Sequence, residues 1–407
     1  MRVGVATTLG VRLARIALGL VTSILTARFL GPDGRGDYIL TVTLAALVVQ
    51  FGNLGLHSSN TYLVAKDRGM YSGLVSNSIA AAALSIPLSA IAVWVASLLD
   101  GRAGNWLWWA AALAPASLFL LLGANLLVGM GRIALFNLFE FGYAAVAVPL
   151  IVIAGLLGGE VGGILFASVA AAWMASIVLL VVLLRGHVRV RFDAAVLRAS
   201  IRFAAKAYLV ALLGFLLLRV NVFLLERFAG PAELGQYSVA SQIADVLSVL
   251  PASVALVVFP KLVAEQDRRW PMLLRSTRTT ALLIVVLCVA AAVIASPFIG
   301  IAYGAAFLPA VPMLLFLLPG IVLLAVTTIL SQYLAARGLP VTLAVAWAVA
   351  LLTGIFASWI LIRSAGGIGA SIGLSVAYAV LFVLVSIVTI VERNRELVPA
   401  TVQQKPA

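Results

Sequence analysis

Two arginines one helical turn apart, Arg12 and Arg15, interrupt an apolar stretch near the start of the chain. On an α-helix, a single polar stripe holds both arginines together with Thr8, Gly19, Thr22 and Thr26. A guanidinium keeps its charge at physiological pH and can bind phosphate through two parallel N–H groups. The pattern favours a diphosphate-binding site; the alternative is that both side chains extend to the aqueous boundary of the stretch.

Three of the charged residues within later apolar stretches are candidates for a functional role. Arg219 shares a helix face with Tyr208, and we expect Arg219 to contact the same ligand. Asp245 lies on a stripe with Ser241; it is expected either to pair with an arginine such as Arg219 or to bind a coupling proton or Na⁺. Glu140 is a second candidate for ion coupling, although its place near the start of its stretch favours the aqueous boundary.

A second polar stripe consists of Gln50, Asn53, His57 and Asn60, which recur at helical spacing. These side chains are expected to line a wet cavity and bind sugar hydroxyls. The alternative is that they form hydrogen bonds between helices, each contributing about 1 kcal/mol.

Motifs for enzymatic chemistry are missing from the sequence. There is no Gly-rich loop ending in Gly-Lys-Ser/Thr for ATP, and no His/Cys/Asp/Glu cluster has metal-ligand spacing. The only cysteine, Cys288, lies in an apolar run. We therefore expect a transporter rather than an enzyme, with no cofactor or resident metal and with H⁺ or Na⁺ as candidate coupling ions.

The surrounding composition is that of a membrane protein. The chain has 407 residues, of which 64% are hydrophobic and only 10% are charged, and its mean hydropathy is +1.17. A membrane-spanning helix needs about 20 mostly apolar residues. Twelve such windows are predicted, at 5–29, 37–64, 72–98, 106–129, 133–157, 161–184, 203–227, 237–260, 279–302, 308–335, 340–362 and 368–391.

The net charge of +13 would suggest nucleic acid in a soluble protein, but here it reflects orientation in a membrane. Placing the N-terminus in the cytoplasm puts 18 of the 27 Lys and Arg residues there and only five, including Arg35, on the opposite side. Both termini are then cytoplasmic. The basic loops 185–202 and 261–278 suit anionic lipid headgroups, and no nucleic-acid partner is expected.

A short motif occurs twice, at residues 27–38 and 226–237. The shared frame, R-F-x-G-P-x-x-x-G-x-Y, keeps a constant offset of 199 residues. Each copy reads as a tight turn between helices, because Pro fixes its φ and Gly allows positive φ. The pattern predicts a six-helix lobe at 1–184, a basic linker at 185–202, a second parallel lobe at 203–391 and a tail at 392–407.

The motif at 27–38 and the stretch Asn53–Leu56 resemble the polysaccharide (Wzx-type) flippases of the multidrug/oligosaccharidyl-lipid/polysaccharide superfamily. The resemblance implies an all-α polytopic fold and alternating access. It also implies transport of a polyprenyl-diphosphate-linked oligosaccharide across the cytoplasmic membrane for cell-surface polysaccharide synthesis, with a polysaccharide polymerase and glycosyltransferases as partners. Abundant Ala and the excess of Arg over Lys are typical of a GC-rich bacterial genome.

Two other functions fit part of the sequence. A cation-coupled drug or small-molecule exporter of the same superfamily would rely on Asp245 or Glu140, but cationic spans disfavour cationic substrates. A membrane glycan polymerase or ligase would need sizeable outer loops carrying acidic residues, whereas the predicted outer loops are short.

Overall fold

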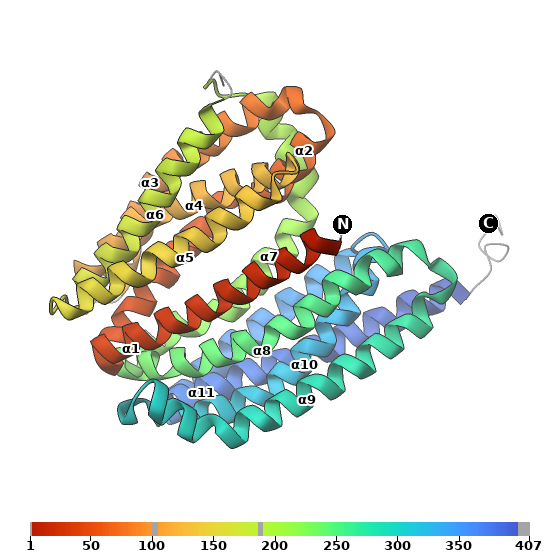
Figure 1. Ribbon diagram of the computed structural model, residues 1–407. Coiled ribbons are helices and arrows are strands. Elements are labelled where there is room, and N and C mark those ends of the chain that lie inside the picture. Colours follow the sequence, from red (N-terminus) through yellow and green to blue (C-terminus); the bar gives the residue numbers. More distant parts are fainter. Residues whose placement is uncertain (1, 100–104, 186–189, 398–407) are drawn as a thin grey trace. The chain divides into compact units, whose positions relative to one another are not determined.

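The computed structural model describes residues 2–99, 105–185 and 190–397 and contains only helices in this part of the chain (Figure 1). Four short 3₁₀ turns, at Arg68–Met70, Asn105–Leu107, Gln266–Arg268 and Ala305–Phe307, precede longer helices. The α-helices are α1 (Arg2–Asn53), α2 (Leu56–Lys66), α3 (Tyr71–Leu99), α4 (Trp108–Gly129), α5 (Ile133–Leu156), α6 (Val161–Leu184), α7 (Ala194–Ala229), α8 (Pro231–Ala264), α9 (Arg269–Ala302), α10 (Ala310–Ala336) and α11 (Val341–Leu397).

Ten helices in the described residues are long and apolar enough to cross a membrane. Two of them contain a break at a glycine with positive φ, namely α1 at Gly31 (φ 65°) and α11 at Gly366 (φ 53°). Splitting α1 and α11 there gives the twelve predicted spans, so the all-α fold class is confirmed. The cytoplasmic position of the termini stays a prediction.

Glycine and proline determine where these helices break. Gly31 adopts a conformation that side chains with a Cβ disfavour, and Pro32 follows at the first position of the next helical segment, where its missing N–H costs nothing. The second copy of the motif does the same, with Gly230 (φ 88°) before Pro231 at the start of α8. The predicted span 37–64 has a further break, because Leu54 and Gly55 both have positive φ between α1 and α2.

The chain divides into two compact units. The first contains residues 1–212 with the short segments 229–238 and 302–306, and the second contains 213–228, 239–301 and 307–407. The division falls within α7, so the first part of this helix belongs to the first unit. The repeat borders predicted from the sequence stay predictions.

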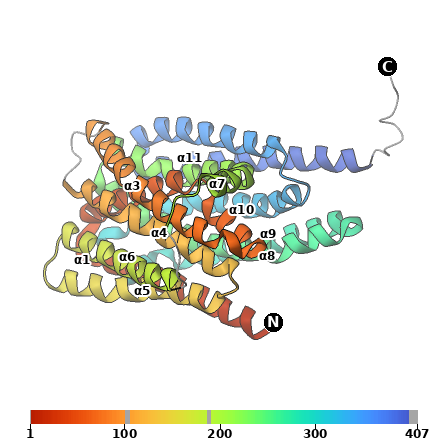
Figure 2. The same ribbon diagram turned by 90° about the horizontal axis from the view of Figure 1, so that it is seen from above.

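The core of the first unit is built around α4, which contacts α1, α2, α3 and α6. Leu74 and Val75 of α3 pack there with Leu126 and Leu127 of α4 and Leu179 of α6. Helices α5 and α6 lie side by side in both views (Figure 1, Figure 2). In the second unit, α10 and α11 pack along each other. Many large apolar side chains of both units are exposed, as expected for surfaces that face lipid.

Candidate functional site

Of the predicted arginine pair Arg12 and Arg15, the structure describes the side chain of Arg15. Arg15 on α1 forms an ion pair with Glu140 on α5, with 3.2 Å between Nη1 and Oε2. Both side chains are partly exposed, at 50% and 30%. The side chain of Arg12 lies outside the described part of the structure. Arg15 is thus a cation held by a carboxylate that a ligand could displace.

A second ion pair lies in the second unit. Arg219 on α7 approaches Asp245 on α8, with 3.6 Å between Nη2 and Oδ2. Their side chains are 37% and 42% exposed. This pairing is one of the alternatives that the sequence left open for Asp245. Because both groups are accessible, the guanidinium can exchange the carboxylate for an anionic ligand without exposing a sealed core.

Two residues of the polar stripe of the second predicted span, Asn53 and Asn60, form hydrogen bonds within the first unit. Asn53 is buried, and its Oδ1 accepts a hydrogen bond from the backbone N–H of His57 across the break before α2. Asn60 is also buried, and its Nδ2 donates to Ser78 Oγ (3.0 Å) and to the carbonyl oxygen of Leu122 (3.1 Å). These are the interhelical hydrogen bonds that the sequence left as an alternative.

The other residues of the predicted cavity are more open. Gln50 and His57 are half-buried, and the backbone oxygen of Gln50 accepts a hydrogen bond from Tyr208 Oη (2.8 Å). Ser241, one turn before Asp245 on α8, is half-buried as well. Their role in lining a transport cavity stays a prediction.

The structure adds one cation that the sequence placed in an outer loop. Arg35 is 1% exposed, in the turn between the two segments of α1. It donates hydrogen bonds to the carbonyl oxygen and hydroxyl of Ser23 (2.8 Å each), to Thr26 Oγ1 and to Ser238 Oγ of α8 (2.9 Å). The hydroxyl groups of Ser23 and Tyr303 also lie within hydrogen-bonding distance, at 3.2 Å. Arg35 therefore connects α1 with the beginning of α8, and its partner Ser23 connects α1 with Tyr303.

The two copies of the repeated turn pack against each other beside Arg35. A Cβ on Gly36 would overlap with the carbonyl oxygen of Pro231, and a Cβ on Gly235 would overlap with that of Pro32. Each copy thus places its proline on the glycine of the other, an arrangement with local two-fold character. We call the two turns, 31–36 and 230–235, with Arg35 and its partners the clasp. It lies entirely within the first unit.

Alanine at Gly36 or Gly235 is expected to disrupt the clasp, because backbone atoms of the opposite turn occupy the place of the new methyl group. We expect each variant to lower the free energy of unfolding by about 1–3 kcal/mol, as overpacking does in tight cores. Thermal unfolding of the purified protein measures this. Gly19→Ala on α1 is the matched control, since nothing lies within 4 Å of its Cβ position. Equal stability of the Gly36 variant and this control would contradict the close packing.

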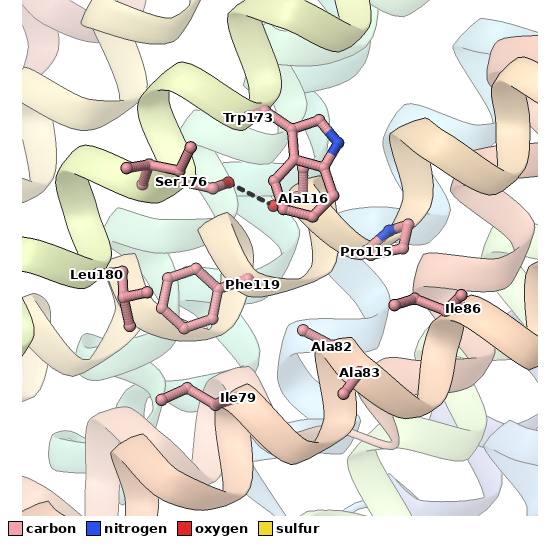
Figure 3. A pocket seen from close by; sticks show the side chains of 11 residues that line it. Ile79, Ala82, Ala83, Ile86, Pro115, Ala116, Phe119, Trp173, Ser176 and Leu180 are labelled. Atoms are coloured by element: carbon pink, nitrogen blue, oxygen red, sulfur yellow. Dashed lines mark hydrogen bonds between the residues drawn. The ribbon is translucent and has the colours of Figure 1, made fainter. Parts of the chain in front are cut away.

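An apolar groove of about 220 Å³ lies between α3, α4 and α6 (Figure 3). Its two side chains with polar atoms both bond to the backbone of α4: Ser176 Oγ donates to the carbonyl oxygen of Ala116 (2.7 Å) and Trp173 Nε1 to that of Ala112 (2.9 Å). The rest of the lining is apolar, and none of the lining residues belongs to either ion pair.

The chain matches the family model described as "Polysaccharide biosynthesis protein" over residues 2–266. The chain belongs to this family. That membership confirms the resemblance carried by the repeated turn, and it agrees with a multi-pass membrane protein. No curated protein sequence matches the chain.

Solved transporter structures share the fold. The lipid II flippase MurJ in an inward closed conformation has a TM-score of 0.77 and 16% identity, covering 94% of this chain and 86% of that one. An inward-facing multidrug resistance MATE family transporter of the MOP superfamily has a TM-score of 0.71 and 15% identity, with 93% and 94% covered. A mutant of the MATE transporter VcmN from Vibrio cholerae has a TM-score of 0.64 and 14% identity, with 93% and 92% covered. At these identities the likeness defines the fold of this family member, not its substrate.

Proposed function

We propose that the protein is a flippase that carries a lipid-linked oligosaccharide with a diphosphate group across the cytoplasmic membrane by alternating access. The observation that carries this proposal is the presence of two accessible arginines, Arg15 and Arg219, each within a membrane-spanning helix and each held by a carboxylate. A charge at membrane depth is costly and marks a ligand path. The polysaccharide biosynthesis family supplies the substrate class.

Exchange of anions on the arginines gives the transport step a physical basis. A diphosphate that reaches Arg15 takes the place of Glu140, and one that reaches Arg219 takes the place of Asp245. Phosphate oxygens accept hydrogen bonds from the same N–H groups, and a diphosphate carries more negative charge than a carboxylate. The released carboxylate then binds H⁺ or Na⁺, since an unpaired carboxylate in an apolar helix is costly. Substrate binding and ion binding are coupled in this way without ATP.

The clasp provides the closed side of the alternating-access cycle. Its turns lie on the side that the charge bias predicts to be opposite the cytoplasm. While Arg35 bonds Ser23, Thr26 and Ser238, the middle of α1 stays attached to the beginning of α8. Release of the substrate requires these bonds to open, and their re-formation returns the protein to the state that loads from the cytoplasm.

Deletion of the gene tests the function. We expect a lipid-linked oligosaccharide to accumulate in the cytoplasmic leaflet and surface polysaccharide to fall, with both restored by the wild-type gene. The lipid-linked pool is measured by mass spectrometry of extracted lipids. The oligosaccharide that accumulates identifies the substrate, and the glycosyltransferases that make it and the polymerase that uses it are the expected partners.

A cation-coupled small-molecule exporter is the second candidate, favoured by the carboxylates Asp245 and Glu140 and by the likeness to MATE transporters. In that case the deletion would raise sensitivity to toxic cations and leave the lipid-linked pool unchanged. This result would replace the flippase proposal.

A further inference from the structure

The segment that enters α7 is fixed to the first unit by hydrogen bonds. Asn77 on α3 donates from Nδ2 to the carbonyl oxygen of Asp193 (2.8 Å) and accepts at Oδ1 from its N–H (3.0 Å). The N–H of Arg191 donates to Ser76 Oγ (3.0 Å). Residues 191–193 are thereby anchored along the beginning of α3.

The first turns of α7 are held in the same way. The Asp193 carboxylate accepts from the N–H groups of Ala195 and Val196 (3.0 Å each) and caps the helix. Val196, Ser200 and Ala204, at four-residue spacing, are buried against the unit. One helix face is therefore fixed inward, and the opposite face has a defined outward direction.

The outward face combines cations with apolar side chains. Arg198 and Arg202, one turn apart, are exposed, and neither forms an ion pair within the described residues. Ile201 and Phe203 flank the arginines on the two sides of the helix, with Phe203 towards the packed face, and both are exposed, as is Phe192 before the helix. The Phe203 ring stacks on Tyr62 of α2 at 4.2 Å, which holds this side chain in place.

The position of this face indicates what covers it. Helix α7 begins at Ala194, whereas the apolar window of the sequence begins at residue 203, so Arg198 and Arg202 lie just before the apolar region. Exposed Lys66 and Arg68 follow α2, whose Tyr62 contacts α7. The nearby Asp193 carboxylate is already used as a helix cap. The surface is thus positive, with apolar side chains suited to the headgroup region of a bilayer.

We propose that the face formed by Phe192, Arg198, Ile201, Arg202 and Phe203, the α7 surface, binds the headgroups of anionic phospholipids. The two guanidinium groups pair with lipid phosphates while the apolar side chains enter the upper acyl region. This binding is independent of the transported substrate and holds the first unit at a fixed depth in the membrane.

Native mass spectrometry of the purified full-length protein with dioleoyl phosphatidylglycerol or dioleoyl phosphatidylcholine tests the proposal. Wild type is expected to bind phosphatidylglycerol more tightly. Arg198→Gln and Arg202→Gln should each reduce this preference about fivefold, because each basic residue near a lipid surface contributes about 1 kcal/mol. Both side chains are exposed, so the variants should unfold at the wild-type temperature.

The control is Arg227→Gln with Arg363→Gln, which removes the same charge from two exposed positions that the charge bias places opposite the cytoplasm. The control should keep most of the preference. The proposal is overturned if the double variant Arg198→Gln/Arg202→Gln binds phosphatidylglycerol like wild type. In that case an acidic protein partner would be the better candidate for the α7 surface. It is equally overturned if the control loses as much preference, since the effect would then be one of total charge.

Discussion

Replacing Arg35 by leucine is expected to open the clasp. Leu234 occupies the equivalent position in the second copy of the motif, so the substitution gives both turns the same residue there. The variant loses the charged hydrogen bonds to Ser23, Thr26 and Ser238. Even two such bonds at about 1.5 kcal/mol each amount to about 3 kcal/mol. The ratio of closed to open clasp should then fall by about two orders of magnitude.

A single-cysteine reporter measures this opening. Cys288 is the only cysteine, so Cys288→Ser with Leu234→Cys leaves one thiol, at a position that is fully buried in the closed clasp. We expect Arg35→Leu to raise the rate of labelling by a membrane-impermeant maleimide at least tenfold, and transport to fall because the closed state is no longer held.

Arg227→Leu is the control for the reporter, because Arg227 belongs to the same motif but is exposed. Arg227→Leu should leave the labelling rate close to that of the Cys288→Ser/Leu234→Cys protein without a further substitution. Circular dichroism distinguishes opening from unfolding. Slow labelling in a folded Arg35→Leu variant would show that the buried arginine does not hold the clasp.

The spans and their breaks could be predicted because they depend on local sequence. Apolar length defines a span wherever the chain is surrounded by lipid. Gly31 and Gly366 end helical segments through their own backbone conformation, whatever packs against them. The break at Leu54 and Gly55 was not predicted, since no proline marks it and the window remains apolar on both sides.

The role of Arg35 could not be read from its neighbours in the sequence. An arginine between Gly34 and Gly36 in a predicted turn normally faces water, and its partner Ser238 lies 203 residues away. The repeated motif nevertheless indicated that the position of Arg35 is special. The two copies agree at their Gly, Pro and Tyr positions but differ at Arg35 and Leu234, and both of these residues are buried.

Helix periodicity predicted the faces of the charged residues but only some of their partners. Pairing with an arginine such as Arg219 was one of the two alternatives for Asp245, and the structure places Arg219 beside it. The pairing of Arg15 with Glu140 was not anticipated, because a stripe on one helix does not indicate which helix packs against it. Asn60 was ambiguous for the same reason until its partners Ser78 and Leu122 were located.

Loss of Arg219 is expected to reduce transport strongly, and loss of its carboxylate partner should not restore it. A hydrogen bond from an arginine to a charged diphosphate contributes about 1.5–3 kcal/mol, so Arg219→Gln should lower flux about tenfold or more. If the arginine only neutralised Asp245, the double variant Arg219→Gln/Asp245→Asn would recover, since removing both charges leaves none unpaired. If it binds a diphosphate, the double variant stays as inactive as the single one.

The double-mutant cycle therefore separates a structural ion pair from a ligand site that is paired at rest. Flux of a lipid-linked oligosaccharide in reconstituted vesicles is the measurement, and thermal unfolding reports the structural share. The ion pair of Arg337 and Glu392 (3.4 Å) in the same unit is the matched control, because neither residue belongs to the candidate site. There Arg337→Gln/Glu392→Gln should recover both stability and flux. Recovery of flux in the Arg219/Asp245 double variant would instead show that Arg219 does not bind the diphosphate. Arg15 would then be the remaining candidate cation whose side chain the structure describes.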